Sequence, residues 1–125
     1  MGSVSWAAKY KTAPVPAYKI SKAALHMLSA QYALDHADAG FTFLCVSPGV
    51  TTPLEWPQKR YTNSLQWLKT ELGGDYAQFD VGVGVSELKR IILQATKAQN
   101  GKFVNIHIPG QEKSWGQYDG REIPW

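Results

Sequence analysis

The sequence has few of the features that would indicate a disulfide framework or a membrane protein. Cys45 is the only cysteine among its 125 residues, so no disulfide can form within the chain. A thiol inside an apolar run such as 41–46 is usually buried and inert. No apolar run approaches the roughly 20 residues that a membrane-spanning helix needs, and no charged start precedes an apolar block at residue 1. We therefore expect a soluble, cytoplasmic protein with no membrane partner.

Runs of basic residues and clusters of metal ligands are also missing from the sequence. The formal net charge is +3, but the lysines and arginines are scattered, so we expect no nucleic-acid partner. His26 and His36 have no second ligand at metal spacing, which predicts surface or helix-end histidines and no metal site. With 44% hydrophobic and 12% aromatic residues, the chain is long enough for one compact domain over residues 1–125.

What the sequence does contain is a tyrosine and a lysine four residues apart, Tyr18 and Lys22, within a predicted helix over residues 17–36. Residues four apart share one face of a helix. A lysine ammonium held beside a tyrosine stabilises the phenolate, so such a tyrosine can exchange a proton with an alcohol or a carbonyl near neutral pH. The spacing therefore favours redox-enzyme chemistry.

The predicted helix is apolar on nearly all sides. Two neighbouring stripes carry its large and small apolar residues, Leu25, Leu28 and Tyr32 on the first and Met27, Ala30 and Leu34 on the second. A helix with apolar residues all round is buried in a core or against a partner. The continuous apolar run 41–46 predicts an interior parallel strand, and Ser47-Pro48-Gly49 ends it.

These segments together resemble one family. The string Tyr18-Lys19-Ile20-Ser21-Lys22-Ala23-Ala24-Leu25, followed by the strand 41–46 and by Ser47-Pro48-Gly49, is similar to the short-chain dehydrogenase/reductase family, and more closely to its fungal carbonyl-reductase-like members. The resemblance implies an α/β fold, namely the C-terminal portion of a Rossmann-like, doubly wound parallel sheet. The N-terminal, dinucleotide-binding half with its glycine-rich turn is missing, and Gly82-x-Gly84 does not replace it because no strand precedes it.

The resemblance also implies catalytic roles for particular residues. Tyr18 would be the proton donor, and Lys22 would activate it and hydrogen-bond the ribose of the cofactor. The family has a substrate-orienting serine shortly before the tyrosine, and Ser5 lies thirteen residues before Tyr18. The alternatives are that the true serine precedes Met1 and that Ser5 is an ordinary loop serine.

The implied cofactor is NAD or NADP. Besides Tyr18 and Lys22, the resemblance places Pro48 and Gly49 beside the nicotinamide, where a threonine four residues after the glycine holds the carboxamide. Here that position is proline, and Thr52 is a nearby threonine.

Removing residues 50–66 would join Pro48-Gly49 to Trp67 and bring Thr70 to the expected position. Residues 50–66 therefore form a predicted insertion. We consider two origins for it. One is a retained intron translated in frame, since valine codons begin with GT and a glutamine codon can be CAG. The other is a genuine, lengthened substrate loop. Sequencing the transcript decides between them.

The C-terminal part continues the α/β pattern. Apolar residues at helical spacing predict a surface helix over 83–98, and alternation over 103–108 predicts a half-covered edge strand in which His107 is structural. The tail 109–125 has no period and reads as an ordered cap or a subunit contact.

Two functions follow from these patterns. The first is an NAD(P)-dependent oxidoreductase acting on a small-molecule carbonyl or alcohol, present as a truncated fragment that we expect to be inactive. The alternative is a non-catalytic interaction module. In either case helix 17–36 is expected to pack against a second copy or against a full-length relative.

Overall fold

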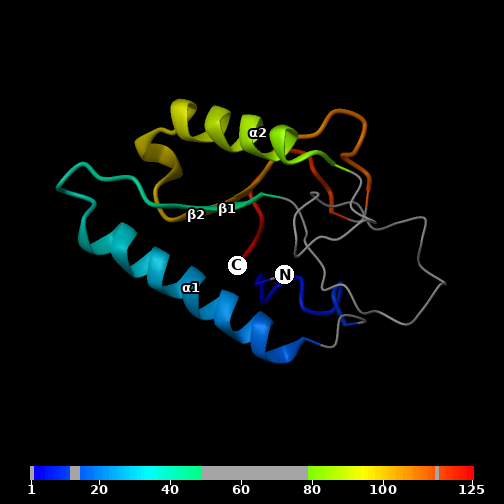
Figure 1. The fold of residues 1–125 in the computed structure, drawn as a ribbon. Helices are drawn as coiled ribbons and strands as arrows, with labels where there is room; N and C mark the ends of the chain where they lie inside the picture. Colours follow the sequence, from blue (N-terminus) through cyan, green and yellow to red (C-terminus); the bar gives the residue numbers. More distant parts are fainter. Residues whose placement is uncertain (1, 12–14, 49–78, 115) are drawn as a thin grey trace. The chain divides into compact units, whose positions relative to one another are not determined.

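The structure is a computed structural model that describes residues 2–11, 15–48, 79–114 and 116–125 (Figure 1). The elements follow the predicted order of helix, strand, helix and strand. They are α1 (Pro16–Asp35), β1 (Leu44–Ser47), α2 (Val81–Gln94), a short 3₁₀ helix η1 (Lys97–Gln99) and β2 (Lys102–Asn105). No described helix is both long enough and apolar enough to cross a membrane.

Helix α1 begins with proline in its first turn, where the missing N–H is not needed and the fixed φ suits a helix. It ends at His36, whose main-chain N–H bonds to carbonyl oxygens of the last turn. His36 is therefore a helix-end histidine, as predicted. The turn after it closes with Gly40 at a φ of 80°, a conformation that glycine adopts without strain.

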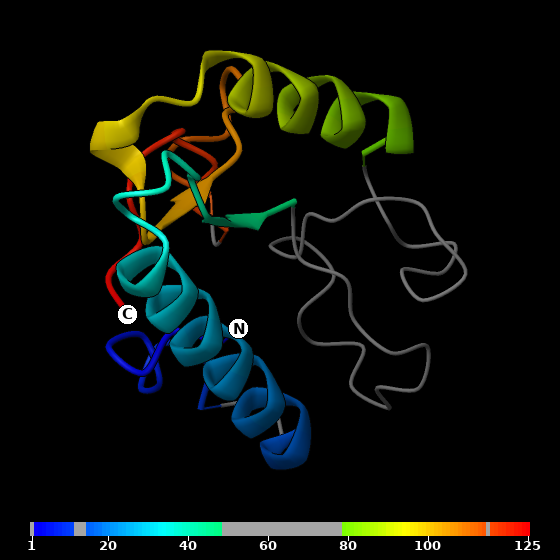
Figure 2. The same ribbon diagram turned by 90° about the vertical axis from the view of Figure 1, so that its left-hand side faces the viewer.

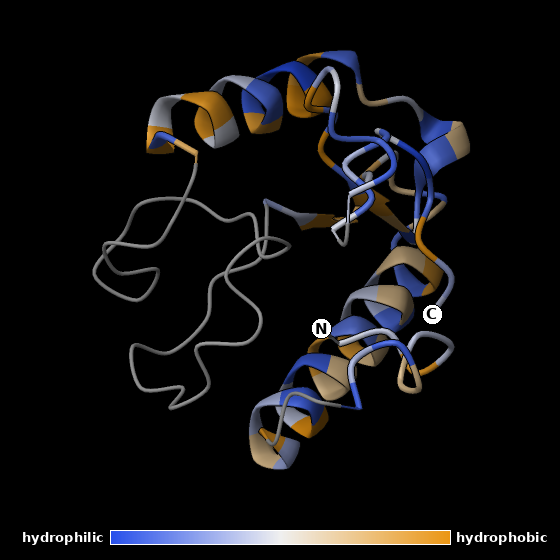
Figure 3. Cartoon of the chain, turned by 90° about the vertical axis from the view of Figure 1, so that its right-hand side faces the viewer, coloured by the Kyte–Doolittle hydropathy of each residue, from blue (hydrophilic) through white to orange (hydrophobic). Residues whose placement is uncertain are grey.

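The buried face of α1 is not one of the two predicted stripes. The large residues Leu25, Met27, Leu28, Tyr32 and Leu34 are all exposed by 46% or more. The side chains that are buried or half-buried repeat at three- and four-residue spacing and are mostly small or polar, namely Lys19, Lys22, Ala23, His26, Ser29, Ala30 and Ala33. A hydropathy view shows apolar residues distributed around α1 (Figure 3). The periodicity located the helix correctly, but with apolar residues on most sides it could not select the packed face.

Strands β1 and β2 pair into a two-stranded sheet. The Gly101 N–H donates to the Phe43 carbonyl at 2.9 Å, and the Ile106 N–H donates to the Ser47 carbonyl at 3.3 Å. Because both partners advance in the same direction, the strands are parallel. Cys45 in β1 is half-buried, whereas the apolar run predicted a buried thiol.

The chain divides into two compact units, described here one at a time. Unit 1 comprises Met1–Val46, Ala95–Val104 and Glu122–Trp125, and unit 2 comprises Ser47–Gln94 and Asn105–Arg121. In unit 1 the buried apolar side chains come from the N-terminal segment, α1, β2 and the tail, and are Tyr10, Ala33, Phe103, Val104 and Ile123. The blue N-terminal segment and the red tail both lie beside α1 in Figure 2.

In the described part of unit 2 the buried apolar side chains are Ile91 from α2 and Ile106, Ile108 and Tyr118. The segment around His107 pairs antiparallel with Asp119. The expected half-covered alternation over 103–108 is wrong, because Phe103 to Ile106 are consecutively buried. Both faces of this stretch are covered, as in a strand of the interior.

Candidate functional site

Tyr18 and Lys22 lie one turn apart on α1, and the structure brings their side chains together. The Lys22 Nζ lies 5.3 Å from the centroid of the Tyr18 ring, within the range of a cation–π contact. Tyr18 is 39% exposed and Lys22 is half-buried. The pair thus combines an exposed tyrosine with an ammonium that lies over its ring.

Ser5, the candidate for the substrate-orienting residue, lies in the N-terminal segment of unit 1. Its hydroxyl and its main-chain N–H both donate to the main-chain oxygen of Trp125, the N–H at 2.9 Å. The Ser5 hydroxyl is therefore engaged by the tail. It would have to leave this partner before it could polarise a carbonyl.

Pro48 directly follows β1 in unit 2 and is exposed. The other predicted cofactor-binding residues, Gly49, Thr52 and Thr70, lie outside the described residues, as does the predicted insertion 50–66. Their assignments remain predictions from the resemblance.

The N-terminal segment packs against Lys22 and against the next turn of α1. A Cβ added to Gly2 would lie 2.6 Å from the Lys22 Cβ and 2.9 Å from the His26 Cε1. Since real Cβ atoms do not approach that closely, only glycine fits there without a shift. The Gly2 main chain therefore rests directly on the stem of Lys22 and on the ring of His26.

His26 is buried, with 9% of its surface exposed, so the prediction of a surface or helix-end histidine is wrong for this residue. Its ring lies 4.2 Å from the Phe103 ring and 5.2 Å from the Trp125 ring. Its Nδ1 is buried and has no hydrogen-bond partner among the described residues. The sequence signal for its burial is its position one turn from Lys22 on the same face of the helix, which metal-ligand spacing does not reveal.

The electrostatic surroundings of His26 favour the neutral ring. Burial lowers the pKa of the imidazole, and the positive charges of the amino terminus and of Lys22 lower it further. These effects act in one direction because each disfavours a charged ring.

Two more lysines hold the segment that leads into α1. The Lys19 Nζ donates to the Tyr10 carbonyl at 2.6 Å, which ties the first turn of the helix to that segment. The Lys9 Nζ lies 4.0 Å from the Trp6 ring centroid. Both contacts are within unit 1 and stabilise the entry to the helix that carries Tyr18.

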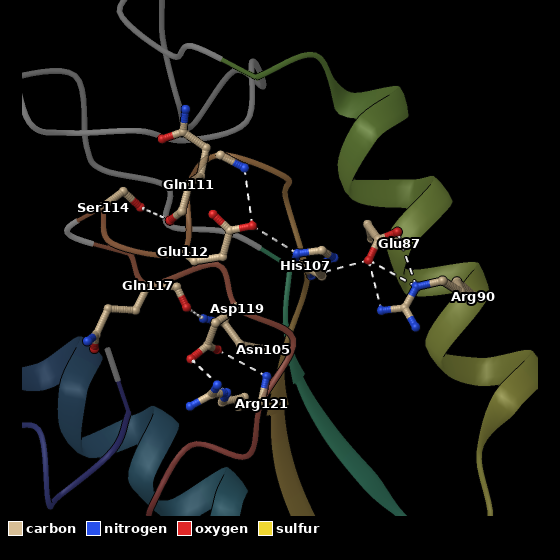
Figure 4. Close-up of polar contacts among 11 residues, drawn as sticks. Glu87, Arg90, Asn105, His107, Gln111, Glu112, Ser114, Gln117, Asp119 and Arg121 are labelled. Atoms are coloured by element: carbon tan, nitrogen blue, oxygen red, sulfur yellow. Dashed lines mark hydrogen bonds and ion pairs between the residues drawn. The ribbon is translucent and has the colours of Figure 1, made fainter.

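Unit 2 contains a separate polar cluster, shown in Figure 4. Glu87 on α2 accepts hydrogen bonds from the Arg90 guanidinium, at 2.9 to 3.2 Å, and from the His107 N–H at 3.2 Å. The hydrogen bond from Arg90, more than any other interaction, lowers the pKa of Glu87. The His107 Nε2 lies 3.1 Å from the Glu112 carboxylate, which also accepts the Gly110 N–H.

This cluster connects α2 to the segment after β2, and its contacts are structural. Asn105, which is 1% exposed, donates from its Nδ2 to the carbonyls of Gly116 and Gln117 at 3.0 and 2.7 Å. Within the described ranges, no three His, Cys, Asp or Glu side chains are grouped so that they could hold a metal ion. The structural role predicted for His107 fits these contacts.

Comparisons with known proteins find that the chain is similar to part of longer proteins. No protein-family model matches it. It is 30% identical over 112 residues to the short-chain dehydrogenase srdF of Neurospora crassa, an alignment that covers 89% of this chain and 36% of that protein.

Two solved structures are similar to the fold. The carbonyl reductase Sniffer of D. melanogaster matches with a TM-score of 0.60 and 26% identity, over 87% of this chain and 32% of that one. An NADPH-bound carbonyl reductase from chicken fatty liver matches with a TM-score of 0.66 and 21% identity, over 99% of this chain and 39% of that one. The second match shows the fold alone. The chain thus spans about a third of the length of the relatives it matches.

Proposed function

We propose that this chain, which is homologous to short-chain dehydrogenases and carbonyl reductases, is the proton-donating part of an NAD(P)-dependent oxidoreductase. The observation that supports this is the Tyr18–Lys22 pair, an exposed phenol with an ammonium 5.3 Å from its ring. In a complete relative this pair would belong to the C-terminal half of the domain.

In this proposal Tyr18 donates a proton to the oxygen of a small carbonyl substrate, or accepts one from an alcohol in the reverse direction. Lys22 favours the ionised phenol at the end of the step. Ser5 would polarise the carbonyl after leaving the Trp125 oxygen. When bound, the nicotinamide cofactor supplies or accepts the hydride.

The described residues fit one end of such a cofactor. Tyr18 is accessible, and Lys22, one turn away, offers an ammonium as a donor to the ribose. The pyrophosphate is bound in such folds by a glycine-rich turn between a strand and a helix, and the printed sequence has none. We therefore propose that the isolated chain binds the nicotinamide end weakly and is inactive or nearly so.

Titrating NADPH and NADH into the purified chain tests this function. We expect saturable binding that weakens about tenfold or more in Lys22→Ala, because a charged hydrogen bond to the ribose is lost. Tyr18→Phe removes the proposed proton donor and should lower any oxidation of NADPH by a small carbonyl compound. Tyr32→Phe, on the same helix and similarly exposed, is the matched control and should leave that oxidation unchanged. The proposal is wrong if Lys22→Ala binds either cofactor as well as the unaltered chain does.

A second candidate function is a non-catalytic interaction module, and it is favoured by a different observation. The exposed side chains of α1 include Leu25, Leu28 and Tyr32, at three- and four-residue spacing. We propose that a second copy of this chain or a longer relative covers this row, which would bury apolar area that is now in water.

A further inference from the structure

The segment Gly2–Trp6 and the residues Pro124–Trp125 are joined by hydrogen bonds into a structure that we call the clasp. The Ser3 hydroxyl donates to the Pro124 carbonyl and accepts the Trp6 N–H at 3.1 Å. The Ser5 N–H donates to the Trp125 oxygen at 2.9 Å. Ser3 is buried, with 4% of its surface exposed, so the clasp is packed as well as hydrogen-bonded.

The clasp encloses the ring of His26. The Trp125 ring meets the imidazole nearly edge-on, at 68°, and stacks on the Phe103 ring at 28° with the centroids 5.9 Å apart. Phe103 also contacts the imidazole directly, at 4.2 Å. Aromatic contacts of this kind hold the imidazole in one position between the two rings. With its Nδ1 buried and unpaired, a charged His26 would have neither water nor an acceptor there.

The clasp also contacts the candidate site. Gly2 presses on the Lys22 Cβ and on the His26 Cε1, and a Cβ at this position would stand only 2.6 Å from that of Lys22. Lys22 and His26 are four residues apart on the packed face of α1. A movement of the Gly2 main chain would therefore change the space available to the Lys22 stem.

We propose that the clasp and the His26 ring it encloses position Lys22, and that protonation of His26 opens the clasp and frees the Lys22 side chain. His26 is thus a positioning residue that acts through Lys22. The coupling of His26 to Lys22 does not depend on the proposed function. Only its consequence for proton donation by the Tyr18–Lys22 pair rests on that function.

The charges around His26 explain the direction of the effect. The positive charge of Lys22, one turn away on α1, and that of the amino terminus both lower the pKa of His26. From β2 it meets the Phe103 ring and from the tail the Trp125 ring, neither of which titrates. The negative group on the tail is the terminal carboxylate of Trp125, which accepts hydrogen bonds from Ser5. A protonated His26 would add a positive charge beside that of Lys22, and its buried Nδ1 would have no acceptor.

NMR of the full chain, with isotope-labelled lysine and histidine, tests the inference. As the pH is lowered, we expect the side-chain signal of Lys22, assigned with Lys22→Arg, to shift with the same midpoint as the His26 ring signal, below 6.5. His26→Gln should remove this step from the Lys22 signal. The matched control His36→Gln, at the end of the same helix, should retain it.

Gly2→Ala provides a second variant that leaves every titrating group in place. Its added Cβ should displace the clasp, so that the Lys22 signal at neutral pH resembles the acid form of the unaltered chain. The inference is overturned if the Lys22 signal does not change as His26 titrates. It is also overturned if the Lys22 signal is the same in Gly2→Ala as in the unaltered chain. Coupled titration without NADPH binding would contradict the proposed function and leave this inference standing.

Discussion

At the scale of single residues, polar side chains in unit 2 form hydrogen bonds with main-chain groups that a longer sheet would otherwise pair. Glu87 reaches from α2 to the main-chain N–H of His107, and Asn105 donates to two carbonyls in the segment that follows. These contacts pair main-chain groups of the segment 107–117, and the Gln117 carbonyl also accepts the Asp119 N–H. Leaving such a group unpaired in the interior costs about 1–3 kcal/mol.

The Glu87 contacts predict how stability depends on pH. The folded chain lowers the pKa of Glu87 below 4.5, so between the folded pKa and 4.5 the unfolded chain binds more protons than the folded chain. The stabilisation is complete above 4.5 and is lost as the pH falls through the folded pKa. We expect Glu87→Gln to reduce the free energy of unfolding by about 1 kcal/mol at neutral pH, and to make no difference in acid. Urea unfolding at both pH values measures this.

Glu122→Gln is the matched control for Glu87→Gln. Glu122 pairs with Lys102 at 2.8 Å, but both side chains are 41% exposed or more, so this ion pair contributes little. We expect no measurable change in the free energy of unfolding. An equal loss in the two variants would contradict the role given to Glu87.

At the scale of elements, the turn Asn100–Gly101 connects α1 to both strands. The Asn100 side chain donates to the Ala33 carbonyl at 2.7 Å and accepts the Phe43 N–H at 2.9 Å. Gly101 donates its N–H to the Phe43 carbonyl and has a φ of 76°. This turn therefore sets how the helix meets the sheet in unit 1.

Two glycine substitutions separate backbone strain from close packing in unit 1. Gly40 and Gly101 have similar positive φ values, 80° and 76°, but an added Cβ would meet nothing within 4 Å at Gly40 and would lie 3.3 Å from the Ala33 Cβ at Gly101. We expect Gly40→Ala to cost about 1–2 kcal/mol from strain alone. Gly101→Ala should cost more, because Ala33 must also move. Chemical denaturation measures both; equal costs would show that the contact with α1 is loose.

At the scale of the whole molecule, the apolar side chains of α1 are mostly on the surface. Leu25, Met27, Leu28 and Tyr32 are between 46% and 61% exposed. On α2, Ile92 and Leu93 are also exposed, by 61% and 74%. The interaction-module candidate therefore predicts that the chain associates, through α1, with a second copy or with a longer relative.

Substitution of the α1 row tests this association. We expect the double variant Leu25→Glu with Leu28→Glu to shift the chain to monomer at concentrations where the unaltered chain associates, because two charges would enter an apolar interface. The control is Ile92→Glu with Leu93→Glu on α2, which should leave association unchanged. Sedimentation velocity over a concentration series measures both. A chain that is monomeric throughout, or two variants that behave alike, would contradict the interaction module.

Much of the fold was predictable because it depends on local sequence. Proline in the first turn and glycine after the last turn bounded α1 to within a residue, and an apolar run located β1. The stretch 103–108 overlaps β2, although the alternation expected there is wrong. The resemblance to short-chain dehydrogenases was carried by short motifs, and it is confirmed by homology to proteins of that kind. Strand lengths and the packed face of α1 were not predictable, because they depend on segments distant in the chain.

The amino-acid sequence by itself determined that Tyr18 and Lys22 share one side of a helix, since four residues make about one turn of any α-helix. Only the tertiary structure decided what surrounds them. Gly2 is 20 residues from Lys22 along the chain, and Trp125 is 99 residues from His26, yet these residues meet in one cluster. Helical spacing is fixed by bonds between near neighbours, whereas burial is decided by which distant segments exclude water from a side chain.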